Sequence, residues 1–290
     1  MDLFLQYLAN GVVVGSSYVL VAVGLTLIFG ILHVVNFAHG EFYMLGGYAG
    51  ITASTAFGLP LPVSLAVVAA VSCLLGLGAE ALLHRGLKNQ DQTSSIIASF
   101  GLAVALQNAV MVTMGPQPEL MHTELAYKAI ELGPVFLPAP RALIPPAMLI
   151  IVGALFAALR WTWTGRSLRA MAQHETVARL CGVKVRRVAV ITFMLGATLA
   201  GVAGFMMSAV YMVHPLVGNM IVLKAFIVVI IGGMGSPLGA AAAGLLLGVI
   251  ESMTSAYLTN GLRDVVGFLL VIAVLLFRPQ GLFGRSLERS

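Results

Sequence analysis

The chain has 290 residues, of which 59% are hydrophobic and only 9% charged, and its mean hydropathy is +0.99. Soluble domains carry about 25% charged residues, so this composition excludes an ordinary globular protein. The net charge of +5 could suggest a nucleic-acid-binding protein. However, the basic residues cluster in loops between apolar segments, so they indicate membrane orientation and no nucleic-acid partner.

Apolar segments of about 20 residues, the length needed to cross a bilayer, recur along the whole chain. We predict spans near residues 8–32, 40–58, 62–83, 94–114, 142–160, 188–212, 221–238, 239–258 and 264–278. No Lys or Arg precedes the first segment, so we expect a retained span and not a cleaved signal peptide. The predicted fold is an all-α polytopic membrane protein, one domain over residues 1–290 with about eight transmembrane helices.

Glycines interrupt the apolar sequence between 221–238 and 239–258, where Gly232, Gly233 and Gly235 precede Pro237. These two runs are either separate spans or one broken, re-entrant element, and the count of eight or nine spans depends on which. Elsewhere, small residues four positions apart favour close helix packing. They are Gly11/Gly15, Gly46/Gly50, Gly196/Ala200/Gly204 and Gly235/Gly239/Ala243.

Lys and Arg concentrate in segment 84–93, in segment 160–187 and in the tail after the last predicted span. Short loops rich in basic residues stay in the cytoplasm, and alternation of the spans puts all three segments on that side. The proline-rich segment 115–141 is predicted to be extracytoplasmic. The cysteines, Cys73 and Cys181, suit packing better than a disulfide or a metal site.

Residues 165–183 are predicted to form one short amphipathic helix of about 14 residues, too short to span the membrane. Ser167 is the expected N-cap, and Gly182 is the expected residue that ends the helix. Such a helix could receive force from a soluble motor, because Ala170, Ala178 and Gly182 would let a partner's groove close around it. It could equally lie on anionic lipid.

Four segments carry a resemblance to a known family. The cytoplasmic segment contains Gly165-Arg166-Ser167-Leu168-Arg169-Ala170 and then Ala178-Arg179-Leu180-Cys181-Gly182-Val183. This pattern resembles the coupling loop of ATP-binding cassette (ABC) importer permeases, and more narrowly that of branched-chain amino acid permeases of the LivH type. Residues 36–48, 231–239 and 278–282 resemble further motifs of that family, and the similarity runs from about residue 5 to 285. His174 departs from the pattern, because the family often has an acidic residue there.

The resemblance implies a permease subunit that translocates branched-chain or related amino acids across a bacterial inner membrane. No P-loop is present, so the chain is not expected to be an enzyme or to hold a cofactor or metal. ATP and Mg²⁺ would bind two partner ATPase subunits, and a second homologous permease and a periplasmic solute-binding protein would complete the transporter. The resemblance places the ATPase-coupling function at Gly165, Arg166, Arg169, Ala170, Glu175, Ala178 and Gly182.

Polar residues inside predicted spans are costly and usually face a cavity or each other, and Glu41, Lys224 and Glu251 are the clearest ionisable cases. Asn36, His39 and Glu41 are therefore candidates for a gate or the translocation path, although a network that caps helix ends is an alternative. Lys224 and the glycine break form a second candidate. Irregular backbone at membrane depth can line a cavity, and helix N-termini can meet a substrate carboxylate.

Two other classes of protein are compatible with a polytopic membrane chain. An intramembrane enzyme is disfavoured, because His39-Gly40-Glu41 is not the His-Glu-x-x-His metal motif and no Gly-x-Ser-x-Gly nucleophile motif occurs. Broken spans and buried charges are also typical of an ion-coupled secondary transporter. In such a protein, however, the basic segment 160–187 would have no evident function. The sequence also leaves open urea, short amides and aromatic acids as substrates.

Overall fold

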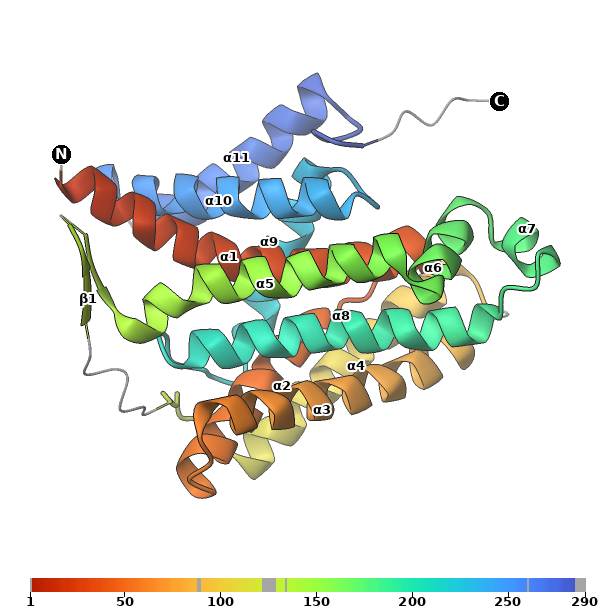
Figure 1. Cartoon of the computed structure of the whole chain (residues 1–290), viewed down its shortest axis with the longest axis horizontal. Helices are drawn as coiled ribbons and strands as arrows, with labels where there is room; N and C mark the ends of the chain where they lie inside the picture. Colours follow the sequence, from red (N-terminus) through yellow and green to blue (C-terminus); the bar gives the residue numbers. More distant parts are fainter. Residues whose placement is uncertain (1, 88–89, 122–128, 134, 260, 285–290) are drawn as a thin grey trace.

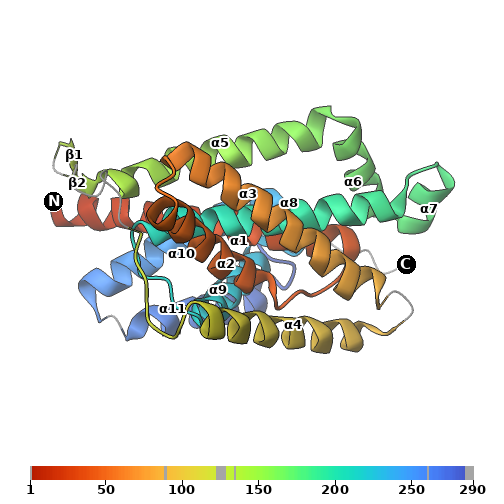
Figure 2. The ribbon, with the colours of Figure 1, turned by 90° about the horizontal axis from the view of Figure 1, so that it is seen from below.

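The structure, a computed structural model, describes residues 2–87, 90–121, 129–133, 135–259 and 261–284. Its long helices run along one axis, with the N-terminus at one end of the bundle and α6 and α7 at the other (Figures 1 and 2). The helices are α1 Asp2–Leu32, α2 His39–Ile51, α3 Leu61–Ala79, α4 Gln92–Thr113, α5 Ala139–Trp161, α6 Trp163–Gln173, α7 Glu175–Leu180, α8 Val185–Ser208, α9 Val217–Gly232, α10 Pro237–Tyr257 and α11 Leu262–Phe277. Helices α2 and α3 continue into π-helical turns, Thr52–Ala56 and Glu80–Arg85.

The predicted all-α polytopic fold is confirmed. In the described ranges six helices are long and apolar enough to cross a membrane: Leu3–Leu32, Leu61–Arg85, Thr93–Thr113, Ala139–Trp161, Val185–Ser208 and Pro237–Tyr257. The other three predicted spans are the shorter helices α2, α9 and α11. At 16 residues, α9 is roughly 24 Å long, less than the ~30 Å of a hydrocarbon core. The runs 221–238 and 239–258 are two helices separated at the glycine break.

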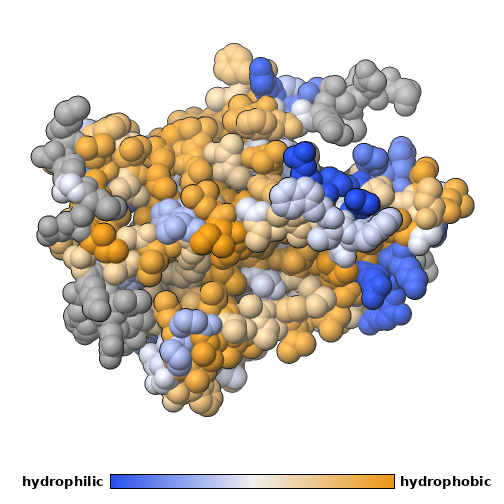
Figure 3. Space-filling view, in the orientation of Figure 1, coloured by the Kyte–Doolittle hydropathy of each residue, from blue (hydrophilic) through white to orange (hydrophobic). Residues whose placement is uncertain are grey.

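Helix α1 lies at the centre of the bundle and α3, α4 and α5 lie at its periphery. In α1 89% of the most apolar stretch is buried, against 22% in each of the other three. Helix α1 packs on α10, α8 and α9. The surface in Figure 3 is largely hydrophobic, and hydrophilic residues gather at the end that carries α6 and α7. An apolar surface of this extent requires lipid or a partner subunit.

Glycines permit the close helix packing that the sequence predicted. A Cβ at Gly15 would lie 2.9 Å from the Leu245 Cα, so α1 and α10 touch through their backbones. Likewise, a Cβ at Gly24 would lie 2.8 Å from the Gly196 carbonyl oxygen on α8. Any side chain at these positions would push the helices apart. The small residues therefore allow α8, α9 and α10 to pack closely around α1.

A small antiparallel hairpin, β1 Ala129–Leu132 and β2 Val135–Pro138, lies within the segment predicted as an extracytoplasmic loop. The hairpin was not predicted from the sequence, because four-residue strands give little periodic signal. The Gln6 side chain donates to the Phe136 carbonyl oxygen and accepts from the Phe136 N–H, both at 2.9 Å. These bonds attach the hairpin to α1. Residues 122–128 of the loop lie outside the described residues.

Candidate functional site

The predicted cytoplasmic helix is two helices, so the prediction of one continuous helix capped by Ser167 is wrong. The backbone is extended at His174 (φ −156°, ψ 108°), which separates α6 from α7. Thr162, also extended, is the N-cap of α6, and its hydroxyl accepts from the Gly165 N–H at 3.0 Å. Ser167 instead donates to the Trp163 carbonyl oxygen one turn back. The earlier cap was missed because the aromatic residues around Thr162 resemble the end of the preceding span.

The predicted stop at Gly182 is confirmed. Gly182 has a φ of +84°, the left-handed conformation that glycine adopts without strain. The Val183 N–H donates to the Ala178 carbonyl oxygen and the Gly182 N–H to the Arg179 carbonyl oxygen, both at 3.0 Å. These bonds satisfy the last carbonyls of α7 in the manner of a Schellman motif. The segment therefore has a defined shape between α5 and α8.

The proposed coupling residues differ in exposure. Arg166, Arg169, Glu175 and Gly182 are exposed, Ala170 is half-buried, and Gly165 and Ala178 are buried. Ala178 is only 3% exposed, so it packs on its own chain and does not offer a surface to a partner's groove. Val177 and Leu180 were not among the predicted coupling residues, yet they are 55% and 83% exposed. Their signal was present: both are apolar residues on the outer face of an otherwise polar segment.

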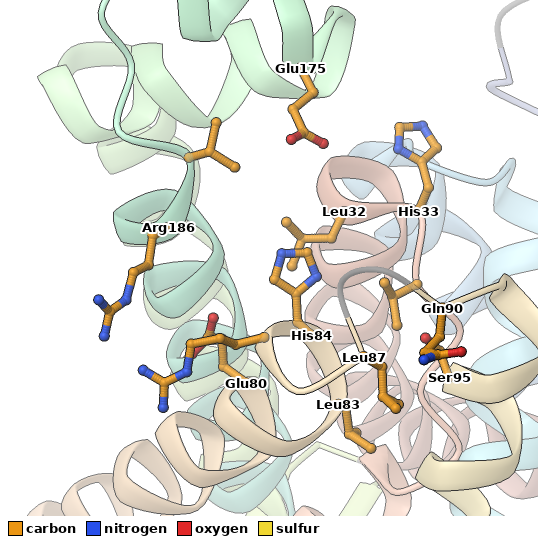
Figure 4. A pocket seen from close by; sticks show the side chains of 13 residues that line it. Leu32, His33, Glu80, Leu83, His84, Leu87, Gln90, Ser95, Glu175 and Arg186 are labelled. Carbon is orange, nitrogen blue, oxygen red and sulfur yellow. The ribbon is translucent and has the colours of Figure 1, made fainter.

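A cavity of about 390 Å³ lies between α7, the end of α1, the π-helical turn after α3 and the start of α4 (Figure 4). Arg85 and Arg186 both line it, so two of the basic segments come to the same end of the bundle. Glu175 of α7 points across the cavity toward His84 (Figure 4). Because α6 also contacts α1 and α8, a displacement of α6 and α7 would act directly on the central helix, α1.

Asn36 and His39 make contacts that hold the start of α2. The Asn36 Oδ1 accepts from the Ala38 N–H at 3.1 Å, and His39 Nε2 lies 3.1 Å from the Val21 carbonyl oxygen on α1. Both side chains are fully buried, and their remaining nitrogens, Asn36 Nδ2 and His39 Nδ1, have no partner in the described part of the chain. These contacts agree with the alternative in which the pair caps and fixes a helix end.

Glu41 belongs to a different cluster, formed where α2, α4 and α9 meet. The Gln107 amide nitrogen lies 2.8 Å from Glu41 Oε1 and 2.8 Å from Asn219 Oδ1. The other Glu41 oxygen is buried and has no hydrogen-bond partner within the described ranges. A Cβ at Gly218 would lie 2.5 Å from the carboxylate, so α9 approaches it closely. Gln107 and Asn219 were not anticipated, because helices distant in sequence bring them together.

Lys224 is part of a buried ion network at the junction of α1, α9, α10 and α11. Its ammonium donates to Glu251 Oε1 at 2.5 Å and to Asp264 Oδ1 at 2.7 Å. Arg263 Nε donates to Glu251 Oε2 at 2.8 Å, and the Tyr18 hydroxyl donates to the same oxygen at 2.9 Å. Two cations thus face two carboxylates. The sequence identified Lys224 and Glu251 but not Arg263 and Asp264, which lie at the edge of a predicted span.

The glycines of the break do not join that network. Gly233 and Gly235 have φ values of +98° and +83°, and a Cβ at Gly232 would overlap the backbone at the start of α10. The Leu282 N–H donates to the Ile231 carbonyl oxygen at 2.8 Å, so the C-terminal motif closes the end of α9. The N-terminus of α10 is capped by Ser236, whose hydroxyl accepts from the Gly239 N–H at 3.2 Å. Gly232 and Gly233 are therefore buried in protein, whereas Gly235 is exposed.

Among the described residues, no group of three or more His, Cys, Asp or Glu side chains is arranged to hold a metal ion. The arrangement is instead that of a tightly packed bundle with buried polar clusters and a structured, exposed segment at one end.

Comparisons with known proteins agree on one family. The family described as "Branched-chain amino acid transport system / permease component" matches residues 7–275. The chain is 35% identical to the high-affinity branched-chain amino acid transport system permease protein LivH of Salmonella typhimurium, covering 97% of this chain and 96% of that protein. It is 34% identical to BraD of Pseudomonas aeruginosa over the same shares. The permease protein LivM of Escherichia coli is 27% identical over 91% of this chain and 67% of its own length. No solved structure matches the chain.

Proposed function

This chain belongs to the family of branched-chain amino acid transport system permease components, and from that premise we propose that it is the membrane-spanning subunit of an ABC importer of branched-chain amino acids. Its relatives' names favour this substrate over urea or short amides, and a transport system permease over an ion-coupled secondary transporter. The protein is a multi-pass membrane protein, and we place it in a bacterial inner membrane.

The observation that carries the proposal is the exposed α6–α7 segment between the spanning helices α5 and α8. A membrane subunit without a nucleotide site needs a rigid element that a soluble ATPase can grip. Here α6 and α7 have fixed caps and present exposed apolar side chains, Val177 and Leu180, beside exposed charges. Exposed apolar residues at the water-facing end of a membrane protein favour a protein partner.

In the proposed transport cycle, the partner proteins bind the inward-open and outward-open states with different affinities. Two ATPase subunits would close on ATP and move α6 and α7, and the contacts of α6 with α1 and α8 would pass the movement into the bundle. The energy that separates the inward-open from the outward-open state must come from ATP and from the loaded periplasmic binding protein, because this chain alone supplies none. A second, homologous permease subunit, similar to the permease protein LivM, would form the other half of the translocation pathway.

Recovery of partners tests the assembly. The tagged protein would be purified from mild detergent, and co-purifying subunits would be identified by mass spectrometry. We expect ATPase subunits and a second permease with the wild type, and loss of the ATPases alone with Leu180→Glu. The matched control is Phe136→Glu, since Phe136 is 57% exposed at the opposite end of the bundle. Ala178→Arg is unsuitable, because Ala178 is buried and the variant would disturb folding.

Uptake tests the function itself. The assembled complex in proteoliposomes, with ATP inside and the binding protein outside, should accumulate leucine, isoleucine and valine but not urea. Uptake should stop without ATP and persist when ionophores remove ion gradients. Uptake that follows the ion gradient and ignores ATP would reject the importer proposal in favour of a secondary transporter.

A further inference from the structure

A small cavity lies toward the end of the bundle opposite α6 and α7. Its volume is about 170 Å³, and its walls come from α1, α2, α8, α9, α11 and the segment that joins α8 to α9. Val14, Val217 and Ile221 form an aliphatic part of the wall, and the Arg263 side chain forms a cationic part. Val14, Val217, Ile221 and Arg263 lie outside the family motifs noted in the sequence, whereas Tyr43, which also lines the cavity, lies in the motif at residues 36–48. The cavity therefore combines one charge with a branched apolar surface.

Neighbouring residues hold the Arg263 guanidinium in place. Its Nε donates to Glu251 at 2.8 Å and its Nη2 to the Tyr18 hydroxyl at 3.1 Å. Glu251 also accepts from Lys224, which pairs in turn with Asp264, so the four charges of the network balance and Arg263 shares its carboxylate with a second cation. A guanidinium has five N–H donors and binds carboxylates readily, in one plane. At 35% side-chain exposure Arg263 remains accessible from the cavity.

A second polar group, the Ser17 hydroxyl, also lines the cavity. Ser17 is 1% exposed and lines the cavity beside Tyr43, and its Oγ makes no hydrogen bond of good geometry among the described residues, the Tyr43 hydroxyl being its nearest polar neighbour. A buried hydroxyl without a partner is costly, and a polar ligand or water would relieve that cost. It lies on the same helix as Tyr18, whose hydroxyl receives the bond from Arg263.

The rim of the cavity is attached to the hairpin end of the bundle. Tyr211 lies under the Arg141 guanidinium, 5.5 Å from its carbon to the ring centre. Val213 exchanges two backbone hydrogen bonds with Glu119, at 2.9 and 2.7 Å. Glu119 and Arg141 both belong to the predicted extracytoplasmic segment. Movement of that segment, for example by a docked binding protein, would therefore change the opening of the cavity.

We propose that this cavity is a transient substrate site, in which Arg263 holds the carboxylate of an amino acid and Val14, Val217 and Ile221 contact its branched aliphatic side chain. The inference rests on the proposed function, since it assigns the place where the imported amino acid is recognised inside the membrane subunit. Ligand sites commonly combine such an apolar wall with a few placed polar groups. The cavity is distinct from the Glu41 cluster.

Binding by the assembled transporter, without the binding protein, tests the carboxylate contact. Labelled leucine would be displaced from the purified complex with 4-methylpentanoate, which lacks the amine, and with 3-methylbutylamine, which lacks the carboxylate. We expect the acid to compete at least about tenfold better than the amine, and Arg263→Gln to remove that preference. Equal competition by the two analogues, or no saturable leucine binding to the wild type, would overturn the proposal.

Side-chain selectivity gives a test that does not depend on Arg263. In proteoliposomes with saturating binding protein, Val217→Phe should lower the leucine-to-alanine uptake ratio about tenfold, because the larger ring fills the aliphatic wall. Val67→Phe, a matched change at an exposed position on α3, should leave the ratio unchanged. If the wild type imports leucine but Val217→Phe keeps its selectivity, the cavity proposal alone fails. If the wild type imports no amino acid, the proposed function itself fails.

Discussion

Removing the charge of Glu251 should destabilise the bundle strongly, because this carboxylate is fully buried and receives three donors. Glu251→Gln leaves Lys224 and Arg263 with Asp264 as their remaining described carboxylate, and Asp264 is half-exposed. Breaking a buried ion pair from one side costs about 3–5 kcal/mol. Because the Arg263 side chain is 35% exposed, we take the lower end, about 3 kcal/mol.

Asp264→Asn is the matched control, since it removes the carboxylate at the exposed side of the same network. A partly exposed pair contributes about 1 kcal/mol or less. The double variant Lys224→Met/Glu251→Gln removes one cation and one anion, so the remaining Arg263 and Asp264 balance. It should therefore recover part of the loss, because neutral replacement of a buried pair is often tolerated.

Reversible unfolding in mixed detergent micelles, followed by circular dichroism, would give these differences in free energy of unfolding. The expected order of stability is wild type, Asp264→Asn, the double variant and then Glu251→Gln. A Glu251→Gln protein as stable as Asp264→Asn would refute the reasoning. So would additive losses in the double variant, because additivity means that Lys224 and Glu251 do not stabilise each other.

Three further predictions concern single positions. Gly46→Ala should destabilise the protein by about 2 kcal/mol or more in the same unfolding assay, because its Cβ would overlap the Gly201 backbone. Gly78→Ala, with no atom within 4 Å of the added carbon, should change stability by less than about 1 kcal/mol, and a similar loss in both would contradict the packing argument. Gly182→Ala should weaken the end of α7 by about 1–2 kcal/mol, because its φ is +84°, and faster limited proteolysis at the α7–α8 connection would reveal it. Glu41→Gln should lower ATP-driven uptake while the complex still assembles, because one oxygen of this buried carboxylate is left without a partner; uptake at the wild-type rate would reject a role in the translocation path.

The sequence predicted the helices well where one physical signal dominated. The run of apolar residues before Leu32 defines a span by length alone, and α1 ends there. Gly182 was predicted as a stop because only a residue tolerant of positive φ suits that position, and the structure confirms it. By contrast, the break at His174 depends on one extended residue inside an otherwise helical pattern. Local propensity does not reveal such a break, because packing of α7 on α8 stabilises it.

The clusters could be predicted only in part, because each joins helices that are far apart in sequence. Lys224 and Glu251 were recognisable as ionisable groups inside spans, and the cost of burying them implied partners. Their partners were not identifiable, since Tyr18 lies 233 positions from Glu251 and Gln107 lies 66 positions from Glu41.

Residues that recognise a substrate can likewise come from helices that are far apart in sequence. Sequence reasoning directs attention to the glycine break, yet its first two glycines, Gly232 and Gly233, are buried against α10 and the C-terminal segment. The cavity beside Arg263 is formed largely by ordinary valine, isoleucine, methionine and tyrosine side chains, of which Tyr43 lies in a family motif. In a bundle held together by backbone contacts between glycines, the larger side chains mark the places where the helices separate. A search for the translocation path should therefore begin at those side chains, and the Val217→Phe selectivity ratio is the measurement that decides whether this reasoning holds.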